Sequence, residues 1–207
     1  MTLKEKIDAL VELEWGGFHN VKNEGGQASC QRDDETFYIM RSSQFSVWSE
    51  EMIDSYTDDL QRAFAAGRNL PAEKYAWMEA ITAPKKFENL KELLLQPTEL
   101  SLQFIEEITK IQTAWMEEYA AQYPYVAAGN RYIRQKDAPP YATSFETYTW
   151  GELHTYSERT LALYAKRVLE YKEAGVNMVT EIMQATVKQY GYEDLDECEA
   201  VTKKRYE

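Results

Sequence analysis

Residues 23–48 read NEGGQASCQRDDETFYIMRSSQFSVW, and the second half of this stretch indicates the fold class. Asp33 or Asp34 is placed to cap a helix over residues 35–48, because a carboxylate there accepts hydrogen bonds from free backbone N–H groups. Helical spacing puts four side chains on one face of that helix: Phe37, Arg41, Phe45 and Trp48. An apolar stripe with a single charge in it predicts a core helix that also carries a polar site.

Arg41 is the charged residue in this stripe, and Gln44 lies one turn further on. A guanidinium group keeps its proton, so on a buried face it requires a carboxylate, a carbonyl oxygen or a bound anion as its partner. The alternative is an arginine that lies along the edge of the bundle with its charged end in water. The sequence leaves both interpretations open.

Glu14 is the predicted partner of Arg41. Residues 2–5 (TLKE) have the spacing of a capping box and predict a first helix. In this helix Glu14 stands where Ile7 and Leu10 predict a further apolar side chain. Opposite charges in the apolar stripes of two successive helices predict a buried ion pair. Because such pairs stabilise poorly, this one is either an internal polar contact or part of a binding site.

Helical patterns continue to the end of the chain, without strand-like alternation or repeats. Ser49, Thr98 and Ser157 are placed to cap further helices. The longest is predicted over about residues 98–122, with one face made of Leu102, Ile105, Ile108, Gln112, Trp115 and Tyr119. From Pro124 to Ser144 the pattern fails, which predicts a long irregular connection. We predict one all-α domain over residues 1–207, a globular bundle of about eight or nine helices.

Composition restricts the classes of partner. The net charge is −12, from 35 acidic and 23 basic residues, which argues against nucleic acid as the main partner and against an anionic membrane. No apolar run approaches the ~20 residues that span a bilayer, and the N-terminus lacks a signal-peptide pattern. Cys30 and Cys198 are enough for one disulfide but not for a disulfide framework. We therefore expect a cytoplasmic protein.

No complete catalytic or cofactor motif is present, so the cofactor is unknown and no metal site is predicted. A di-iron centre needs Glu-x-x-His on two helices, and neither histidine follows an acid at that spacing. Cys30 is a candidate nucleophile beside a helix start, although the acidic residues 33–35 oppose its ionisation and a buried apolar role is the alternative. The candidates for proton transfer or nucleophilic attack are Glu14, His19, Cys30 and His154.

A second polar cluster lies in residues 150–161, WGELHTYSERTL, just before the helix that Ser157 caps. Capping by Ser157 with the other polar groups in water is the simpler interpretation. If the cluster instead meets the first two helices, the candidate ligand-binding residues are Gln31, Arg41, Gln44, Glu152 and Tyr156.

Residues 123–141 form a cationic and aromatic segment in an acidic protein. It contains Arg131, Arg134 and Lys136 among Tyr123, Tyr125, Tyr132 and Tyr141. A tyrosine-packed surface loop and a ligand lid are alternative interpretations. Because aromatic residues and arginine are enriched at interface hot spots, the segment is also a candidate contact surface for a partner protein.

Residues 23–48 and residues 144–161 (SFETYTWGELHTYSERTL) resemble two signatures of the DUF4125 family of uncharacterised bacterial proteins. The first signature is close to N-x-GGxAxCQ-x-D-x-x-TF-x-IMR-x-SQF. The family has no established activity. Some relatives carry a nucleotidyltransferase-like domain, and this implies work on or beside a nucleotide-handling enzyme.

Two hypotheses of function follow. In the first, a polar pocket between the first two helices and residues 152–157 binds, or acts on, a small polar or anionic metabolite. Arg41 would then meet the anion, and Glu14 would orient Arg41. In the second, the chain is a non-enzymatic helical module that docks on a partner protein such as a nucleotidyltransferase-like enzyme.

Overall fold

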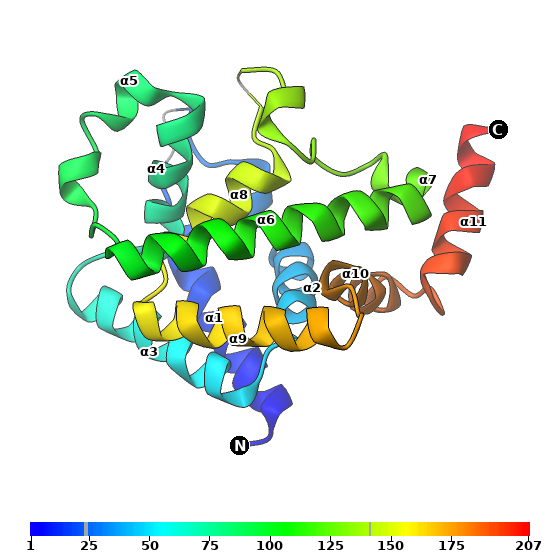
Figure 1. The fold of residues 1–207 in the computed structure, drawn as a ribbon, viewed down its shortest axis with the longest axis horizontal. Helices are drawn as coiled ribbons and strands as arrows, with labels where there is room; N and C mark the ends of the chain where they lie inside the picture. Colours follow the sequence, from blue (N-terminus) through cyan, green and yellow to red (C-terminus); the bar gives the residue numbers. More distant parts are fainter. Residues whose placement is uncertain (23–24, 141) are drawn as a thin grey trace.

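A computed structural model describes residues 1–22, 25–140 and 142–207, so Tyr141 of the predicted contact surface lies outside the described residues. Within these ranges every regular element is helical (Figure 1), which confirms the predicted all-α class. The longer helices are α1 (Leu3–His19), α2 (Asp34–Phe45), α3 (Glu50–Ala65), α4 (Leu70–Thr82), α6 (Glu99–Gln122), α8 (Phe145–Leu153), α9 (Glu158–Glu173), α10 (Met178–Gln189) and α11 (Leu195–Tyr206). Shorter elements in the connections are α5 (Pro84–Phe87), α7 (Pro124–Ala127) and the 3₁₀ turns η1 (Ser29–Arg32), η2 (Lys91–Leu93) and η3 (Gln135–Asp137).

The predicted helix caps form, but α2 is shorter than predicted. The Asp33 carboxylate accepts a hydrogen bond from the backbone N–H of Thr36 at 2.9 Å, as expected for an N-cap. The helix ends at Phe45 instead of Trp48, because Ser49 adopts extended backbone angles and starts α3 as its N-cap. Trp48 is therefore in a turn, although its side chain is buried as predicted.

Helix α6 runs along the long axis of the molecule and organises the other helices (Figure 1). It packs against α8, α9 and α10. Helix α4 packs on α8, and α1 contacts α2, α3 and α4, so the first two helices reach the same interior as α8. At one end of the molecule, α11 packs on α7 (Figure 1).

The buried face of α6 is close to the predicted one. Of the predicted residues, Ile105, Ile108, Gln112, Trp115 and Tyr119 are buried. Leu102 is an error in the prediction, since its side chain is 40% exposed. Ser101 takes the buried position instead, where its hydroxyl accepts a hydrogen bond from the Thr98 cap at 3.0 Å.

An aromatic cluster in the core joins α3 and α9 with the turns that precede them. The rings of Tyr56 and Tyr156 lie 4.7 Å apart, and those of Trp48 and Tyr164 lie 5.2 Å apart. These four side chains are almost fully buried. Large aromatic residues contribute much of the apolar area that a core buries, and the contacts between their tilted rings add to the stability.

The irregular connection after α7 is tied to the start of α8. The backbone N–H groups of Phe145 and Glu146 donate to the carbonyl oxygens of Tyr132 and Ile133 at 2.8 and 3.0 Å. The Gln135 side-chain oxygen accepts from the Thr147 hydroxyl at 2.8 Å and from the Ser144 backbone at 3.2 Å. These bonds fix where Arg131 lies relative to α8.

In the described part of the chain, no helix combines the length and the apolar character needed to cross a membrane. Both cysteines are free thiols, so the disulfide considered from the sequence is not formed. Cys198 is buried, but Cys30 is exposed on η1. The interpretation of Cys30 as a buried apolar filler is therefore wrong, because the short η1 turn holds it at the surface.

Gly151 allows α8 to approach α4 closely. A Cβ atom at this position would lie 2.5 Å from Met78 Cγ and 3.0 Å from the Lys74 carbonyl oxygen. We expect Gly151→Val to lower the free energy of unfolding by about 1–3 kcal/mol or more, because an overpacked helix contact forces the backbones apart. Urea unfolding measures this change. As a control, Gly16→Ala on α1 meets no atom within 4 Å and should be neutral or stabilising; equal effects at both positions would contradict the packing argument.

Candidate functional site

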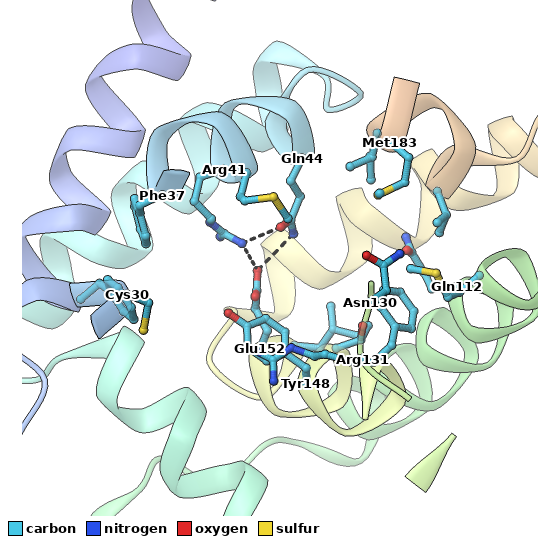
Figure 2. Close-up of a pocket in the computed structure, with 18 of the residues that line it drawn as sticks. Cys30, Phe37, Arg41, Gln44, Gln112, Asn130, Arg131, Tyr148, Glu152 and Met183 are labelled. Carbon is cyan, nitrogen blue, oxygen red and sulfur yellow. Dashed lines mark hydrogen bonds and ion pairs between the residues drawn. The ribbon is translucent and has the colours of Figure 1, made fainter. Parts of the chain in front are cut away.

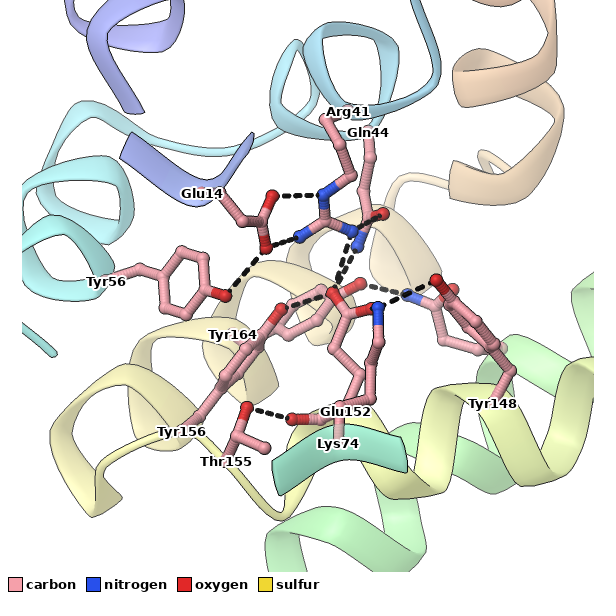
Figure 3. A network of polar contacts seen from close by, with 11 residues as sticks. Glu14, Arg41, Gln44, Tyr56, Lys74, Tyr148, Glu152, Thr155, Tyr156 and Tyr164 are labelled. Atoms are coloured by element: carbon pink, nitrogen blue, oxygen red, sulfur yellow. Dashed lines mark hydrogen bonds and ion pairs between the residues drawn. The ribbon is translucent and has the colours of Figure 1, made fainter. Parts of the chain in front are cut away.

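A buried polar network centred on Arg41 joins α1, α2 and α8 (Figure 3). Arg41 donates from Nε and Nη2 to the two carboxylate oxygens of Glu14 at 2.5 and 2.7 Å. Its Nη1 atom donates to Gln44 Oε1 at 2.6 Å and to Glu152 Oε1 at 2.9 Å. The predicted Glu14–Arg41 ion pair is thus confirmed, and the exposed-edge interpretation of Arg41 is wrong.

Glu152 is the second centre of the network. Its Oε1 atom accepts hydrogen bonds from Arg41, from Gln44 Nε2 at 3.2 Å and from the Tyr156 hydroxyl at 2.7 Å. On the other side of the network, the Tyr56 hydroxyl donates to Glu14 at 2.9 Å. Both carboxylates are therefore held by a cation and a tyrosine, as buried charges require.

Lys74 on α4 supplies the second buried cation. Its Nζ atom lies 3.6 Å from Glu152 Oε2 and donates a hydrogen bond to the Tyr148 hydroxyl at 2.7 Å. Arg41 and Lys74 balance the charges of Glu14 and Glu152. The buried network is consequently neutral as a whole, with no spare charge for a ligand.

The pKa shifts follow from this arrangement. Burial alone lowers the pKa of Arg41, but Glu14 and Glu152 outweigh it and raise the pKa well above its ordinary value. Burial alone raises the pKa of Glu152, but Arg41 and Lys74 lower it below its ordinary value. Burial raises the pKa of Tyr56 and of Tyr156, and the nearby carboxylates raise it further. All four groups keep their usual protonation states at neutral pH.

A cavity of about 440 Å³ opens beside the network (Figure 2). In the view of Figure 2, Phe37 and Cys30 lie at one side of the cavity, Met183 and Gln112 lie at the other, and Arg41 lies between them. The walls are mostly apolar: Phe18, Phe37, Met40, Met116, Phe145, Leu153, Val179, Ile182 and Met183. The cavity therefore combines an apolar wall with one fixed polar side.

The structure brings four of the predicted ligand-binding residues together. Arg41, Gln44, Glu152 and Tyr156 all line the cavity, although they come from sequence positions more than a hundred residues apart. Glu14 lies behind Arg41 and does not line the cavity. The pocket is also wider than predicted, because α6 and α10 contribute much of its apolar wall.

Gln31 and His19 lie away from the cavity. The Gln31 side-chain amide donates to the carbonyl oxygens of Phe18 and Val21 at 3.0 and 2.8 Å and accepts from the Ala28 backbone at 2.8 Å. Its polar groups thus fasten the loop after α1. His19 is exposed, and its Nδ1 atom lies 2.9 Å from the Gln31 carbonyl oxygen. Neither residue is among those that line the cavity.

His154 is buried between two tryptophans outside the cavity lining. Its ring centre lies 3.8 Å from that of Trp150 and 4.5 Å from that of Trp77. Burial lowers its pKa to about 4, against a smaller opposing effect of the Trp150 carbonyl, which lies 2.7 Å from Nδ1. His154 is therefore neutral at physiological pH and has a packing role.

This lowered pKa predicts a pH-dependent stability. Between the folded-state value of about 4 and the ordinary value of 6.5, the unfolded chain binds one more proton than the folded chain. Stability then falls as the pH decreases through this window, by about 2 kcal/mol between pH 7 and pH 5. Urea unfolding at several pH values measures the slope. His154→Phe should flatten it, whereas the exposed His19→Asn should retain it; an unchanged slope in His154→Phe would contradict the assignment.

Cys30 lines the cavity at the exposed η1 turn. Among the described residues, neither His19 nor His154 lines the same cavity, so no imidazole base stands across from the thiol. This arrangement does not resemble a cysteine–histidine pair. Cys30 is thus a free thiol among the residues that line the cavity.

Several residues of the predicted contact segment, residues 123–141, make contacts within the protein. Tyr123 is buried, and Arg134 forms two hydrogen bonds to Glu117 at 2.5 and 2.8 Å. Tyr132 is 51% exposed. Arg131 lines the cavity, and its guanidinium carbon lies 5.0 Å from the centre of the Tyr148 ring.

Lys74 and Tyr148 were missed in the sequence. Lys74 stands three and four residues before the buried Trp77 and Met78 on α4, so the signal was a lysine on an apolar face. Tyr148 lies four residues before Glu152 on α8, just before the second polar cluster of residues 150–161. Neither position shows its partner without the packing of α4 on α8.

Comparisons with known proteins identify a family but add no chemistry. The model of a family described as a protein of unknown function (DUF4125) matches residues 4–200. No match was found among curated proteins or among solved structures.

Proposed function

The chain belongs to the DUF4125 family, whose function is unknown, and we propose from the geometry of the cavity that it binds a small organic molecule there. The observation that carries this proposal is the cavity of about 440 Å³ with the Arg41–Glu152 network along one side. Ligand sites are commonly cavities of about 300–1,000 Å³ with apolar walls and a few convergent polar groups.

In this proposal Arg41 is a positioning residue. Four of its five N–H groups already donate to Glu14, Gln44 and Glu152. An anion that approached Arg41 would also meet the carboxylate of Glu152. We therefore assign Arg41 the role of holding Gln44 and Glu152 at the cavity wall, and we assign these two residues the hydrogen bonds to the ligand.

The compartment that we propose is the cytoplasm. Cys30 is exposed and free, and Cys198 is buried and free. Free thiols are typical of proteins that work in a reducing environment.

A cavity-filling variant tests the proposed function. Thr149 lines the cavity on α8, and Thr149→Trp would occupy part of its volume. Thermal melts with organic acids, amino acids, aromatic compounds and nucleotides should identify a class that stabilises the parent. At a hundred times its Kd, such a compound adds about 2.7 kcal/mol, which is a shift of several degrees.

The control is Thr57→Trp on α3, a half-buried threonine outside the cavity lining. The stabilising compound should act on the parent and on Thr57→Trp but not on Thr149→Trp. If no compound shifts the parent, or if the shift survives in Thr149→Trp, the proposal is wrong.

A further inference from the structure

Resting on the proposed function, we propose that the ligand is an amphipathic acid: an apolar, flat body in the cavity, a carboxylate or similar anionic group at Arg131, and a hydrogen-bond donor at Gln112. Both residues line the cavity. Each retains binding capacity that the protein itself does not use.

Arg131 is the cation available to an anion. Two arginines line the cavity, Arg41 and Arg131. Arg41 is paired with two carboxylates. Within residues 1–22, 25–140 and 142–207, Arg131 has no acidic partner, and its contact is the ring of Tyr148. A guanidinium stacked on an aromatic ring keeps its N–H edge free for a planar carboxylate.

The Tyr148 ring holds Arg131 at the cavity. The guanidinium carbon lies 5.0 Å from the ring centre, and the Tyr148 hydroxyl accepts a hydrogen bond from the buried Lys74 at 2.7 Å. The ring is thus fixed at one end by the network. An anion at Arg131 would lie beside an aromatic wall, and the body of the same molecule would face the apolar side chains of α2 and α10.

Gln112 offers an unused acceptor on the Met183 side of the cavity (Figure 2). Its side chain is only 3% exposed, and its Nε2 atom donates to the Tyr164 hydroxyl at 2.9 Å. In the described part of the chain its Oε1 atom accepts no hydrogen bond. Gln112 lines the cavity, and its Oε1 atom is not among the fully buried polar atoms without a partner in the described residues, so a hydroxyl or amino group of a ligand can reach it and donate to it.

The apolar wall between these two groups selects the body of the ligand. Met116, Val179 and Met183 lie around the Gln112 side, and Phe37 and Met40 lie on α2. Met40 is 46% exposed although it is a large apolar side chain. Methionine and phenylalanine together make an adaptable surface for flat rings. An entirely polar metabolite would leave this wall in contact with water.

Three naphthalene compounds test the inference by fluorescence titration: hydroxynaphthoate with its groups at opposite ends, naphthoate without the hydroxyl group, and naphthol without the carboxylate. Hydroxynaphthoate should bind most tightly. Arg131→Gln should weaken the binding of hydroxynaphthoate and of naphthoate about tenfold, as expected for the loss of one charge-assisted pair. It should leave the affinity for naphthol unchanged. Gln112→Met should weaken only the binding of hydroxynaphthoate and of naphthol, the two compounds that carry a hydroxyl group.

Arg134→Gln is the matched control, because it removes one charge from the same connection at an arginine that is paired with Glu117 and does not line the cavity. It should leave all three affinities unchanged. If Thr149→Trp blocks naphthol while Arg131→Gln leaves the carboxylates unaffected, the inference is wrong and the proposed function stands. If none of the compounds binds the parent, the inference is wrong, and the thermal melts decide the proposed function separately. If binding of these compounds survives Thr149→Trp, both fail.

Discussion

Replacing Arg41 with methionine is expected to lower the free energy of unfolding by about 3–5 kcal/mol. The substitution removes the partner of two carboxylates, Glu14 and Glu152, whose side chains are only 5% and 7% exposed. Lys74 then remains as the single cation for both. Leaving a buried charge unpaired is far less favourable than removing a pair, and this asymmetry gives the expected size of the effect.

The same argument predicts partial rescue by a second substitution. In Arg41→Met with Glu14→Gln, one carboxylate and one cation remain, so the buried charge is again balanced. We expect this double variant to be more stable than Arg41→Met alone, with a coupling energy of about 1–3 kcal/mol. Urea unfolding of the parent, both single variants and the double variant measures this coupling.

A surface ion pair provides the control for this cycle. Arg134 pairs with Glu117, and its side chain is 33% exposed. Arg134→Gln should change the stability by about 1 kcal/mol or less, because solvent screens such a pair. If Arg41→Met were as mild as Arg134→Gln, the guanidinium would not be holding buried charge.

The Glu14–Arg41 pair was predictable because each residue interrupts an apolar stripe of its own helix. A charge at a core position needs a partner, and the two helices are successive. The caps were predictable for a similar local reason, since Asp33, Ser49 and Thr98 precede apolar-periodic segments. In these cases the sequence pattern that supports the prediction lies within a few residues of the position that it predicts.

Lys74 and the cavity depend on contacts between distant segments. Lysine most often has its ammonium group in water, so Lys74 gives no local sign that it meets Glu152. Gly151 permits that meeting through the close approach of α4 and α8. The apolar wall combines side chains of α2, α6, α8 and α10, and no single periodicity describes it.

Gln31 shows the opposite case, in which a residue predicted to bind a ligand is instead bonded to the backbone of its own loop. Its amide is fully buried because the loop after α1 needs donors for its carbonyl oxygens, and Phe18 and Val21 supply those oxygens. A sequence shows that a glutamine stands in a loop. It does not show whether the backbone of that loop or a ligand will satisfy the side chain.

Glu152→Gln is expected to destabilise the fold by about 3–5 kcal/mol at neutral pH and to make its stability rise with pH. The substitution keeps the shape of the side chain but leaves Arg41 and Lys74 with Glu14 as the single carboxylate of the network. An arginine does not release its proton, so the excess charge falls on Lys74. In the parent, burial lowers the pKa of Lys74, but Tyr148 and Glu152 outweigh it and hold the pKa above 10.5.

Without the Glu152 charge, burial and the nearby Arg41 should bring the folded-state pKa of Lys74 below 10.5. Between this lowered pKa and the ordinary value of 10.5, the unfolded variant binds one more proton than the folded variant. The stability of the variant should therefore increase from about pH 7 to about pH 9.5. In the parent, both states keep the lysine proton over this range, and its stability should stay level. Unfolding by urea across these pH values distinguishes the two slopes, with the exposed Glu106→Gln as a control that behaves like the parent. A level curve for Glu152→Gln would mean that the pKa of Lys74 does not depend on the charge of Glu152. The balance of four charges would then not explain why one side of the cavity is polar and rigid.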